Sequence, residues 1–473
     1  MTASALGRGI EAGNIDPVEL MEMYIETAKN HQFSDKIFAR FTEARALNES
    51  ESSRARARKG IRKSLLDGVP ISWKDLFDTA GVVTEAGSLL LENRTPEFDA
   101  DVLKNATDAG LVCLGKTHMS ELAFSGLGVN PITNTPPCVN DLTAAPGGSS
   151  SGAAASVAFN LAAAGIGSDT GGSVRIPAAW NDLVGLKTTI NRLSVRGTVP
   201  LNPDFDTVGP LCRSTEDALH LLCALEGRKV PNLQSIEVKN LKLMVLKTGT
   251  FDDICPEVAE GFNRVLDALK DQGASIVDRD IVEVESAQIL GNTVFPAGAY
   301  GTWKAEIEAA PQLMFPEILD RFRGGKDVLA SDYIHAWIKL RELRHEWLNK
   351  TSEYDAVITI ETPDFLIIHA NDNWHKWPEN MTNEIKKISD KYNEGNIFLL
   401  IQFGIADCFP VNYEGVTEQE GLDIINGRFE RYLKATESNM KSLNLKHMYY
   451  YANQSYFKYK ECKLNGLSMY QIS

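Results

Sequence analysis

A stretch of small residues from position 143 to position 173 most restricts the fold of this chain. Its composition shifts to glycine, serine and alanine, which in another setting is typical of a flexible linker. A linker does not fit here, because residues 153–164 lack proline and are rich in helix formers. The sequence therefore predicts a helix over 153–164 and a tight glycine-rich turn over 165–172 that leads to Ser173.

Apolar periodicity on both sides of this stretch indicates alternating helices and strands. Asp16 and Pro17 are a helix cap and a first-turn proline, and an amphipathic pattern follows to residue 30. Short apolar runs predict buried strands over 68–74, 111–114 and 241–246, with helices over 99–109 and 258–269. This alternation is typical of the α/β class.

Length permits about three domains, but large α/β enzymes often form a single unit of this size. We predict one α/β domain over residues 1–440, without internal repeats, and a basic aromatic tail over 441–473. In the tail, five lysines interleave with tyrosines, namely Tyr449, Tyr450, Tyr451, Tyr456 and Tyr459. Such a segment can bind nucleic acid or partner helices, although a solvated terminus is the commoner structure for it.

Charge and cysteine content narrow the classes of partner and cofactor. Subtracting 63 acidic from 48 basic residues gives a net charge of −15, which repels phosphate backbones and argues against nucleic acid as a partner. The seven cysteines are scattered without CxxC pairs, which predicts reduced thiols and no zinc site of that type. Neither a signal peptide nor an apolar run of about 20 residues is visible, so we predict a cytoplasmic protein with no membrane partner.

The glycine-rich segment before Ser173 has the composition of an oxyanion-binding loop. A serine nucleophile needs a base to take its proton and backbone N–H groups to hold the oxyanion that forms on attack. Glycines allow the backbone to turn its N–H groups inward, and a helix N-terminus would add its dipole. The candidate donors are the N–H groups of Thr170, Gly171, Gly172 and Ser173.

Lys74 is the candidate base. His118 and His220 have no recognisable acidic partner motif, whereas Lys74 lies in the apolar run 69–77. Burial lowers the pKa of a lysine, and a fall from about 10.4 to near 7 lies within the range known for buried lysines. The alternative is a surface ion pair between Lys74 and Asp75.

Two motifs then match a known family. GGSSSG at 147–152 and DTGGSVRIP at 169–177 resemble the amidase signature family, and similarity extends over about residues 10–225. The resemblance implies a large mixed β-sheet flanked by helices on both faces. It also implies a signature core over 60–225 and a divergent C-terminal part over 226–440.

Carried over by position, the resemblance implies that Ser173 is the nucleophile, Ser149 relays its proton and Lys74 is the final base. The reaction would need neither cofactor nor metal and would pass through an acyl-serine ester. Ser150 and Asp169 would support these groups, and the Gly148–Ser149 peptide bond would be cis. From its position, Arg175 could clamp a substrate carboxylate or form a structural ion pair.

Several alternatives stay open. GSSSG at 148–152 also fits a nucleophile elbow centred on Ser150, but no apolar strand precedes it. Within the family, a stand-alone amidase acting on a small amide is favoured over the glutaminase subunit of a tRNA-dependent amidotransferase. A catalytically weak scaffold is the third alternative, because residues 395–425 match the family pattern only weakly. Many relatives form homodimers, and Trp73, Trp180 and the segment near Phe295 are candidates for lining the substrate site.

Overall fold

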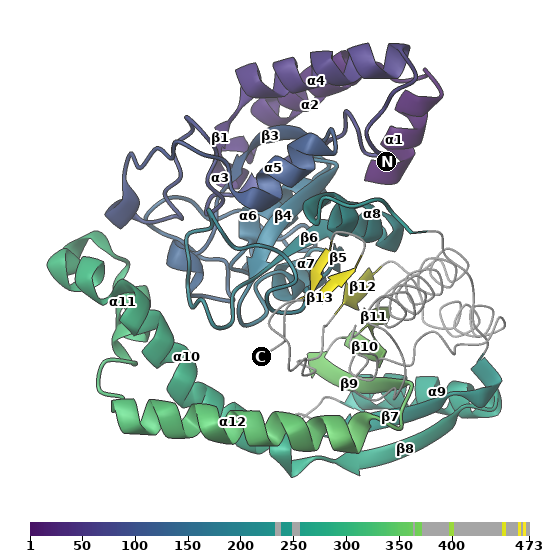
Figure 1. Cartoon of the computed structure of the whole chain (residues 1–473), viewed down its shortest axis with the longest axis vertical. Coiled ribbons are helices and arrows are strands. Elements are labelled where there is room, and N and C mark those ends of the chain that lie inside the picture. The colour runs from purple at the N-terminus through teal and green to yellow at the C-terminus, as the bar shows by residue number, and fades with distance from the viewer. Residues whose placement is uncertain are drawn as a thin grey trace. The chain divides into compact units, whose positions relative to one another are not determined.

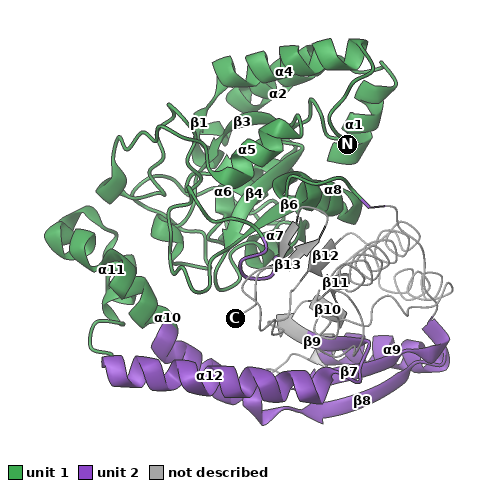
Figure 2. Ribbon diagram, in the orientation of Figure 1, with its two compact units in different colours: residues 1–187, 193–230, 295–328 green, residues 188–192, 231–294, 329–473 purple. Residues whose placement is uncertain are grey.

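The computed structural model describes residues 1–231, 238–247 and 256–362, and five later strands, 365–370, 397–401, 447–450, 462–464 and 467–469. The chain divides into two compact units (Figure 2). Unit 1 comprises residues 1–187, 193–230 and 295–328, and unit 2 comprises 188–192, 231–294 and 329–473. The α/β class with a mixed sheet is confirmed, and the predicted boundary at residue 440 lies outside the described residues.

Unit 1 alternates helices and strands along most of its length (Figure 1). Its elements in chain order are α1 Ala3–Glu11, α2 Pro17–Asn30, α3 Ser34–Ile37, β1 Phe38–Phe41, α4 Glu43–Arg58, β2 Pro70–Lys74, α5 Asp101–Asp108, β3 Val112–Thr117, α6 Ser151–Ala158, β4 Ala164–Asp169, α7 Arg175–Trp180, β5 Val184–Gly185, β6 Thr207–Cys212, α8 Thr215–Leu225 and α11 Pro316–Arg323. Helix α10, Val282–Ala309, contributes its second half to this unit.

The sheet of unit 1 has six strands in the order β1-β3-β2-β4-β6-β5. Strand β2 pairs in parallel with both β3 and β4, while the pairs β1–β3, β4–β6 and β5–β6 are antiparallel. Every residue of β2, β3 and β4 is buried, as expected for parallel strands covered on both faces. Helices α4, α5, α6 and α8 pack on this sheet.

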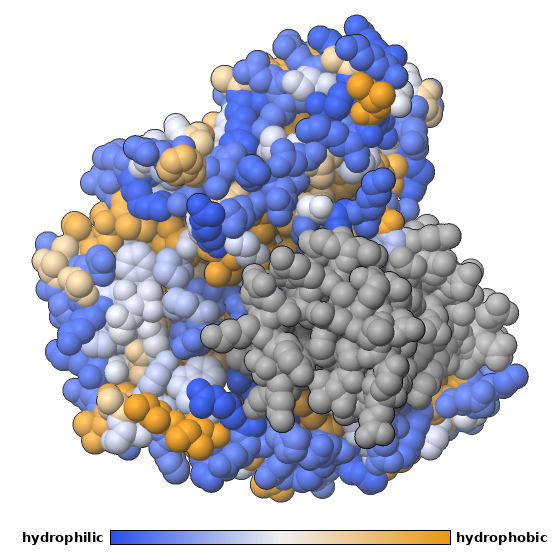
Figure 3. Space-filling model, viewed as in Figure 1, coloured by the Kyte–Doolittle hydropathy of each residue, from blue (hydrophilic) through white to orange (hydrophobic). Residues whose placement is uncertain are grey.

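The surface helices follow their sequence signals. Asp16 caps α2, and its Oδ1 accepts hydrogen bonds from the N–H groups of Val18 and Glu19. Hydrophilic side chains dominate the face over α2 and α4 in Figure 3.

Two further features of the sequence can be followed in the structure. Cys113, Cys138, Cys212 and Cys223 are free thiols. No helix in the described ranges is long and apolar enough to cross a membrane.

The prediction for residues 153–172 was wrong in part. Helix α6 ends at Ala158, because Asn160 adopts the left-handed conformation with φ of 61°. The Ala163 N–H then donates to the Pro70 carbonyl, and the chain continues as β4 beside β2. Residues 164–169 are thus a buried strand, and the predicted glycine-rich turn is confined to the residues after Asp169.

Unit 2 has its own six-stranded mixed sheet, in the order β12-β11-β10-β9-β7-β8. Its elements are β7 Lys242–Lys247, α9 Pro256–Asp271, β8 Ser275–Asp280, the first half of α10, α12 Ala330–Thr351, β9 Ala356–Thr362, β10 Phe365–Ala370, β11 Ile397–Ile401 and β12 His447–Tyr450, with the separate hairpin β13 Cys462–Leu464 and β14 Leu467–Met469. The predicted strand over 241–246 and helix over 258–269 correspond to β7 and α9. Apart from β12 to β14, the predicted tail over 441–473 lies outside the described residues.

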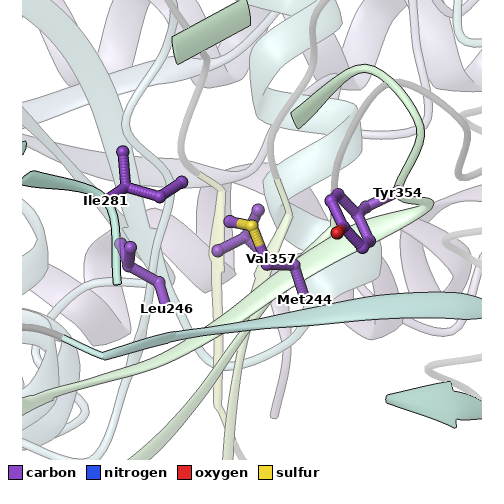
Figure 4. Close-up of a cluster of buried hydrophobic side chains, with 5 residues drawn as sticks. All are labelled: Met244, Leu246, Ile281, Tyr354 and Val357. Carbon is purple, nitrogen blue, oxygen red and sulfur yellow. The ribbon is translucent and has the colours of Figure 1, made fainter. Parts of the chain in front are cut away.

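A small apolar cluster packs against this second sheet (Figure 4). It gathers Met244 and Leu246 of β7, Val357 of β9, Ile281 and Tyr354. Val277, Val284 and Trp347 pack against it from β8, α10 and α12. Burial of this kind contributes about 25 cal/mol per Å² of apolar surface, so unit 2 has a hydrophobic core of its own.

Candidate active site

The two predicted site segments meet at one edge of the sheet in unit 1. Lys74 is the last residue of β2, and Asp169 is the last residue of β4. Because β2 and β4 are parallel neighbours, their carboxyl ends lie at the same edge, where ligand sites of α/β sheets are usually found. The loop after Asp169 carries Ser173, so the topology brings the predicted base and nucleophile to the same region.

Lys74 is completely buried and lies between two serine hydroxyls. Its Nζ is 2.6 Å from Ser149 Oγ and 2.9 Å from Ser168 Oγ. Side chains alternate along a strand, so Ser72 projects to the same face, where its hydroxyl is 2.8 Å from that of Ser156 on α6. The end of β2 therefore places Lys74 next to Ser149, in the segment that leads into α6.

The environment of Lys74 favours its neutral form. Burial lowers its pKa from 10.5 to about 7, against the opposing effect of Asp169 and Asp206. The alternative surface pair with Asp75 is wrong, because Asp75 instead binds Arg40 at 2.9 Å and Lys116 at 3.2 Å. A neutral amine has a lone pair that can accept a proton from Ser149 while one N–H donates to Ser168.

The segment before α6 connects this lysine to the loop of Ser173. The Gly148–Ser149 peptide bond is cis, as the family resemblance implies. The Ser150 N–H donates to the Ser173 carbonyl at 3.2 Å, and the Ser150 hydroxyl donates to the Ser168 carbonyl at 3.3 Å. Among the described residues, no hydrogen bond joins the hydroxyls of Ser149 and Ser173, and the bond from Ser150 to the Ser173 carbonyl connects the two segments.

Asp169 organises the loop that follows β4. Its carboxylate accepts hydrogen bonds from the backbone N–H groups of Gly172, Val174 and Arg175, at 2.8, 3.1 and 3.3 Å. The Gly172 N–H is therefore already engaged, whereas those of Thr170, Gly171 and Ser173 have no acceptor among the described residues. The predicted set of oxyanion donors is thereby reduced from four N–H groups to three.

Arg175 pairs with Asp169 inside the protein. Its Nε and Nη2 donate to the two carboxylate oxygens at 3.0 and 3.1 Å. Burial alone would raise the pKa of Asp169, but Arg175 and the partly buried Lys187 hold it well below its usual range. Of the two roles predicted for Arg175, the structure shows the ion pair.

Ser168 and Asp206 belong to this site but were not predicted from the sequence. Asp206 is buried and accepts a 2.6 Å hydrogen bond from the Thr170 hydroxyl. It also accepts hydrogen bonds from the backbone N–H groups of Leu201 and Asn202, at 3.0 and 3.2 Å. Burial raises the pKa of Asp206 to about 6, despite these hydrogen bonds. Reading residues 164–169 as a strand parallel to β2 would have placed Ser168 beside Lys74.

The three candidates for lining the substrate site lie in different environments. Trp73 is buried and packs edge-on against Phe77 at 5.4 Å, so it belongs to the core. Trp180 is half-buried at the end of α7. Phe295 lies beside Gly171, where a Cβ added to Gly171 would be 3.8 Å from the Phe295 ring.

In the part of the chain that the structure describes, no group of three or more His, Cys, Asp or Glu side chains could hold a metal ion.

Comparisons with known proteins identify the family of this chain. The sequence model of the Amidase family matches residues 19–385. A glutamyl-tRNA(Gln) amidotransferase subunit from Anaeromyxobacter dehalogenans is 40% identical over 231 residues, which are 48% of this chain and 46% of that protein. The corresponding subunit from Marinobacter nauticus is 31% identical over 315 residues, 63% of this chain and 65% of its own. The chain thus matches about half to two thirds of the length of these relatives.

Solved structures show the same fold. A crystal structure of an amidase is 29% identical with a TM-score of 0.69, covering 76% of this chain and 81% of its own. The peptide amidase of Stenotrophomonas maltophilia is 26% identical with a TM-score of 0.64, covering 76% and 83%. With its family model matched from residue 19 to residue 385 and its fold shared with solved amidases, the chain belongs to the amidase signature family.

Proposed function

We propose that this chain hydrolyses a small carboxamide by itself, with Ser173 as nucleophile, Ser149 as proton relay and Lys74 as base. The observation that supports this most directly is the 2.6 Å approach of a buried lysine amine to Ser149 Oγ. A lysine with a pKa of about 7 can accept a proton near neutral pH, which is the condition for general-base catalysis.

In the first half-reaction, Ser173 Oγ attacks the amide carbon. Its proton passes to Ser149 Oγ as the proton of Ser149 moves to Lys74 Nζ. The N–H groups of Thr170, Gly171 and Ser173 are the donors available to the oxyanion. The relay then runs backwards and protonates the leaving nitrogen, so that ammonia or an amine departs and an acyl-Ser173 ester forms.

In the second half-reaction, water attacks the ester carbon and gives its proton to the same relay. Ser173 recovers its proton when the carboxylic acid leaves, and Lys74 returns to its neutral form. The contact between Ser149 and Ser173 must tighten for this reaction, and catalytic hydrogen bonds often shorten only when substrate is bound.

Serine-directed labelling tests the nucleophile. We expect a fluorophosphonate to label Ser173, with labelling lost in Ser173→Ala and strongly reduced in Lys74→Ala, as mapped by peptide mass spectrometry. Ser151→Ala is the matched control, because the Ser151 hydroxyl is buried nearby without a hydrogen-bond partner among the described residues. Labelling of a different serine, or unchanged labelling in Lys74→Ala, would contradict the proposed relay.

The glutaminase subunit of an amidotransferase is the second candidate function. It is favoured by the curated relatives described above, which are named as amidotransferase subunits. Ammonia release from simple amides and from glutamine, measured with the purified chain, separates the two. We expect turnover of simple amides without a partner; release from glutamine alone, and only with added amidotransferase partner proteins, would favour the glutaminase.

Asp206 is expected to raise the pH at which activity begins, through its effect on the pKa of Lys74. Its carboxylate favours the charged form of Lys74, so Asp206→Asn should lower the pKa of Lys74. Because the neutral amine is the active form, the rise of kcat/KM with pH should shift to lower pH in this variant. The profile of Asp204→Asn, which changes an exposed carboxylate two residues away, should match that of the wild type. A rise that stays in place or moves to higher pH in Asp206→Asn would contradict this.

A further inference from the structure

Three phenylalanines from distant parts of unit 1 meet beside residues 170–174, the loop between β4 and α7 that carries Ser173 and is called the nucleophile loop below. Phe295 is the central ring, with its centroid 5.7 Å from that of Phe124 and 5.5 Å from that of Phe205. Phe124 packs edge-on against the fully buried Phe322 at 4.7 Å. This aromatic cluster therefore has one end in the core of unit 1.

The other end of the cluster is open and borders Gly171. Phe124, Phe205 and Phe295 are each only half-buried, and Gly171 itself is exposed. A Cβ built on Gly171 would meet the Phe295 ring at 3.8 and 3.9 Å, in ordinary van der Waals contact. A group bound by the N–H of Gly171 would thus be next to an aromatic ring.

Hydrogen bonds hold Phe295 in this position. Asn202 Nδ2 donates to the Phe295 carbonyl at 3.0 Å, and the Asn202 N–H donates to Asp206. Asp206 also accepts the Thr170 hydroxyl. The Asp206 carboxylate therefore holds both Thr170, at the start of the nucleophile loop, and Asn202, which binds Phe295. A specific binding site requires residues that are held in place by packing and hydrogen bonds in this way.

We propose that Phe124, Phe205 and Phe295 form an apolar subsite that binds an aromatic or branched aliphatic group of the amide substrate. The inference rests on the proposed function, because it assumes that the amide carbonyl binds at the loop of Gly171 and Ser173. The group can be carried by the acyl carbon or by the nitrogen. A phenyl group gains free energy when it leaves water for such a surface, whereas the charged groups of glutamine lose hydration there.

Four probes test the subsite: acetamide, benzamide, acetanilide and glutamine. We expect kcat/KM for benzamide or for acetanilide to exceed that for acetamide by roughly tenfold or more, which is the gain from burying part of one ring. Benzamide places the ring on the acyl side and acetanilide on the nitrogen side, so the two compounds identify which side binds.

Variants of the central ring then test the residues. Phe295→Ala should lower kcat/KM for the preferred aromatic probe by about tenfold and change that for acetamide little, and Phe295→Leu should restore part of the loss. Phe33→Ala is the matched control, since Phe33 is a half-buried ring in a separate aromatic group with His31 and Phe159.

The possible failures are distinguishable. If no amide is turned over and Ser173 is not labelled, the proposed function fails. If amides are hydrolysed but the aromatic probes show no advantage over acetamide, the subsite is overturned while the proposed function stands. Equal losses for acetamide and the aromatic probe in Phe295→Ala would assign the ring a structural role and would also overturn the subsite.

Discussion

Lys74→Met is expected to abolish amide hydrolysis and at the same time to stabilise the fold. Activity should fall by about 10³-fold or more, because the base and the relay it serves act as a unit. The free energy of unfolding should rise by about 2–4 kcal/mol near pH 7, because methionine fills the site without the cost of burying an amine. Denaturant unfolding and steady-state ammonia release measure the two effects.

The pH dependence of the wild type follows from the same group. Activity needs the neutral amine, so kcat/KM should rise as pH increases through about 7, the pKa of Lys74. The folded pKa lies below the unfolded value of 10.5, so between these two values the unfolded chain binds more protons than the folded one. Stability should therefore increase with pH over this window, and Lys74→Met should lose that increase.

Lys116→Met provides the contrast. Lys116 is equally buried, but it forms an ion pair with Asp75 at 3.2 Å and donates to the Thr84 hydroxyl at 3.0 Å. Removing it leaves Asp75 with one cation fewer in the interior, so this variant should be destabilised. If Lys74→Met is destabilised like Lys116→Met, or keeps its activity, Lys74 is a structural residue rather than the base.

The sequence was sufficient to predict the parts of the site that depend on local pattern. The apolar run around Lys74 predicts a buried strand, and Lys74 is indeed at the buried end of β2. The paired motifs identify the family, and the family model confirms it. These features depend on residues close together in the chain, where spacing and apolar content carry the information.

Features that depend on strand pairing could not be predicted in the same way. Helix-forming alanines continue past residue 158, yet Asn160 in the left-handed conformation ends α6 and the following residues pair with β2. That pairing, a tertiary effect that overrides helix propensity, is what places Ser168 against Lys74. The hydrogen bond from Thr170 to Asp206 spans 36 positions, so the residues around either one do not reveal it.

Asp169→Asn is expected to lower both stability and activity. The variant removes the negative charge that interacts with both Arg175 and the partly buried Lys187. Breaking a buried pair by changing one partner costs about 3–5 kcal/mol. The same change weakens the acceptor that holds the N–H groups of Gly172 and Val174, so kcat should fall by about 10²-fold because the oxyanion donors lose their alignment.

Asp67→Asn separates the two effects. Asp67 is buried in unit 1 and accepts hydrogen bonds from Arg56 at 2.8 and 2.6 Å, in a pairing that resembles that of Asp169 and Arg175. Both variants should unfold at lower denaturant concentration, but at a temperature where both are folded only Asp169→Asn should lose kcat. Equal kcat values in the two variants would show that Asp169 stabilises the fold without positioning the nucleophile loop.

Acid titration gives an independent measurement of the same carboxylate. Because Arg175 and Lys187 hold the pKa of Asp169 below its unfolded value of 3.8, its contribution to stability is complete above that pH and is lost as the pH falls further. The wild type should therefore lose stability steeply below about pH 4. Asp169→Asn has no proton to bind at this position, so its stability should fall less steeply over the same range, and an unchanged slope would mean that Asp169 is not the charged partner of Arg175.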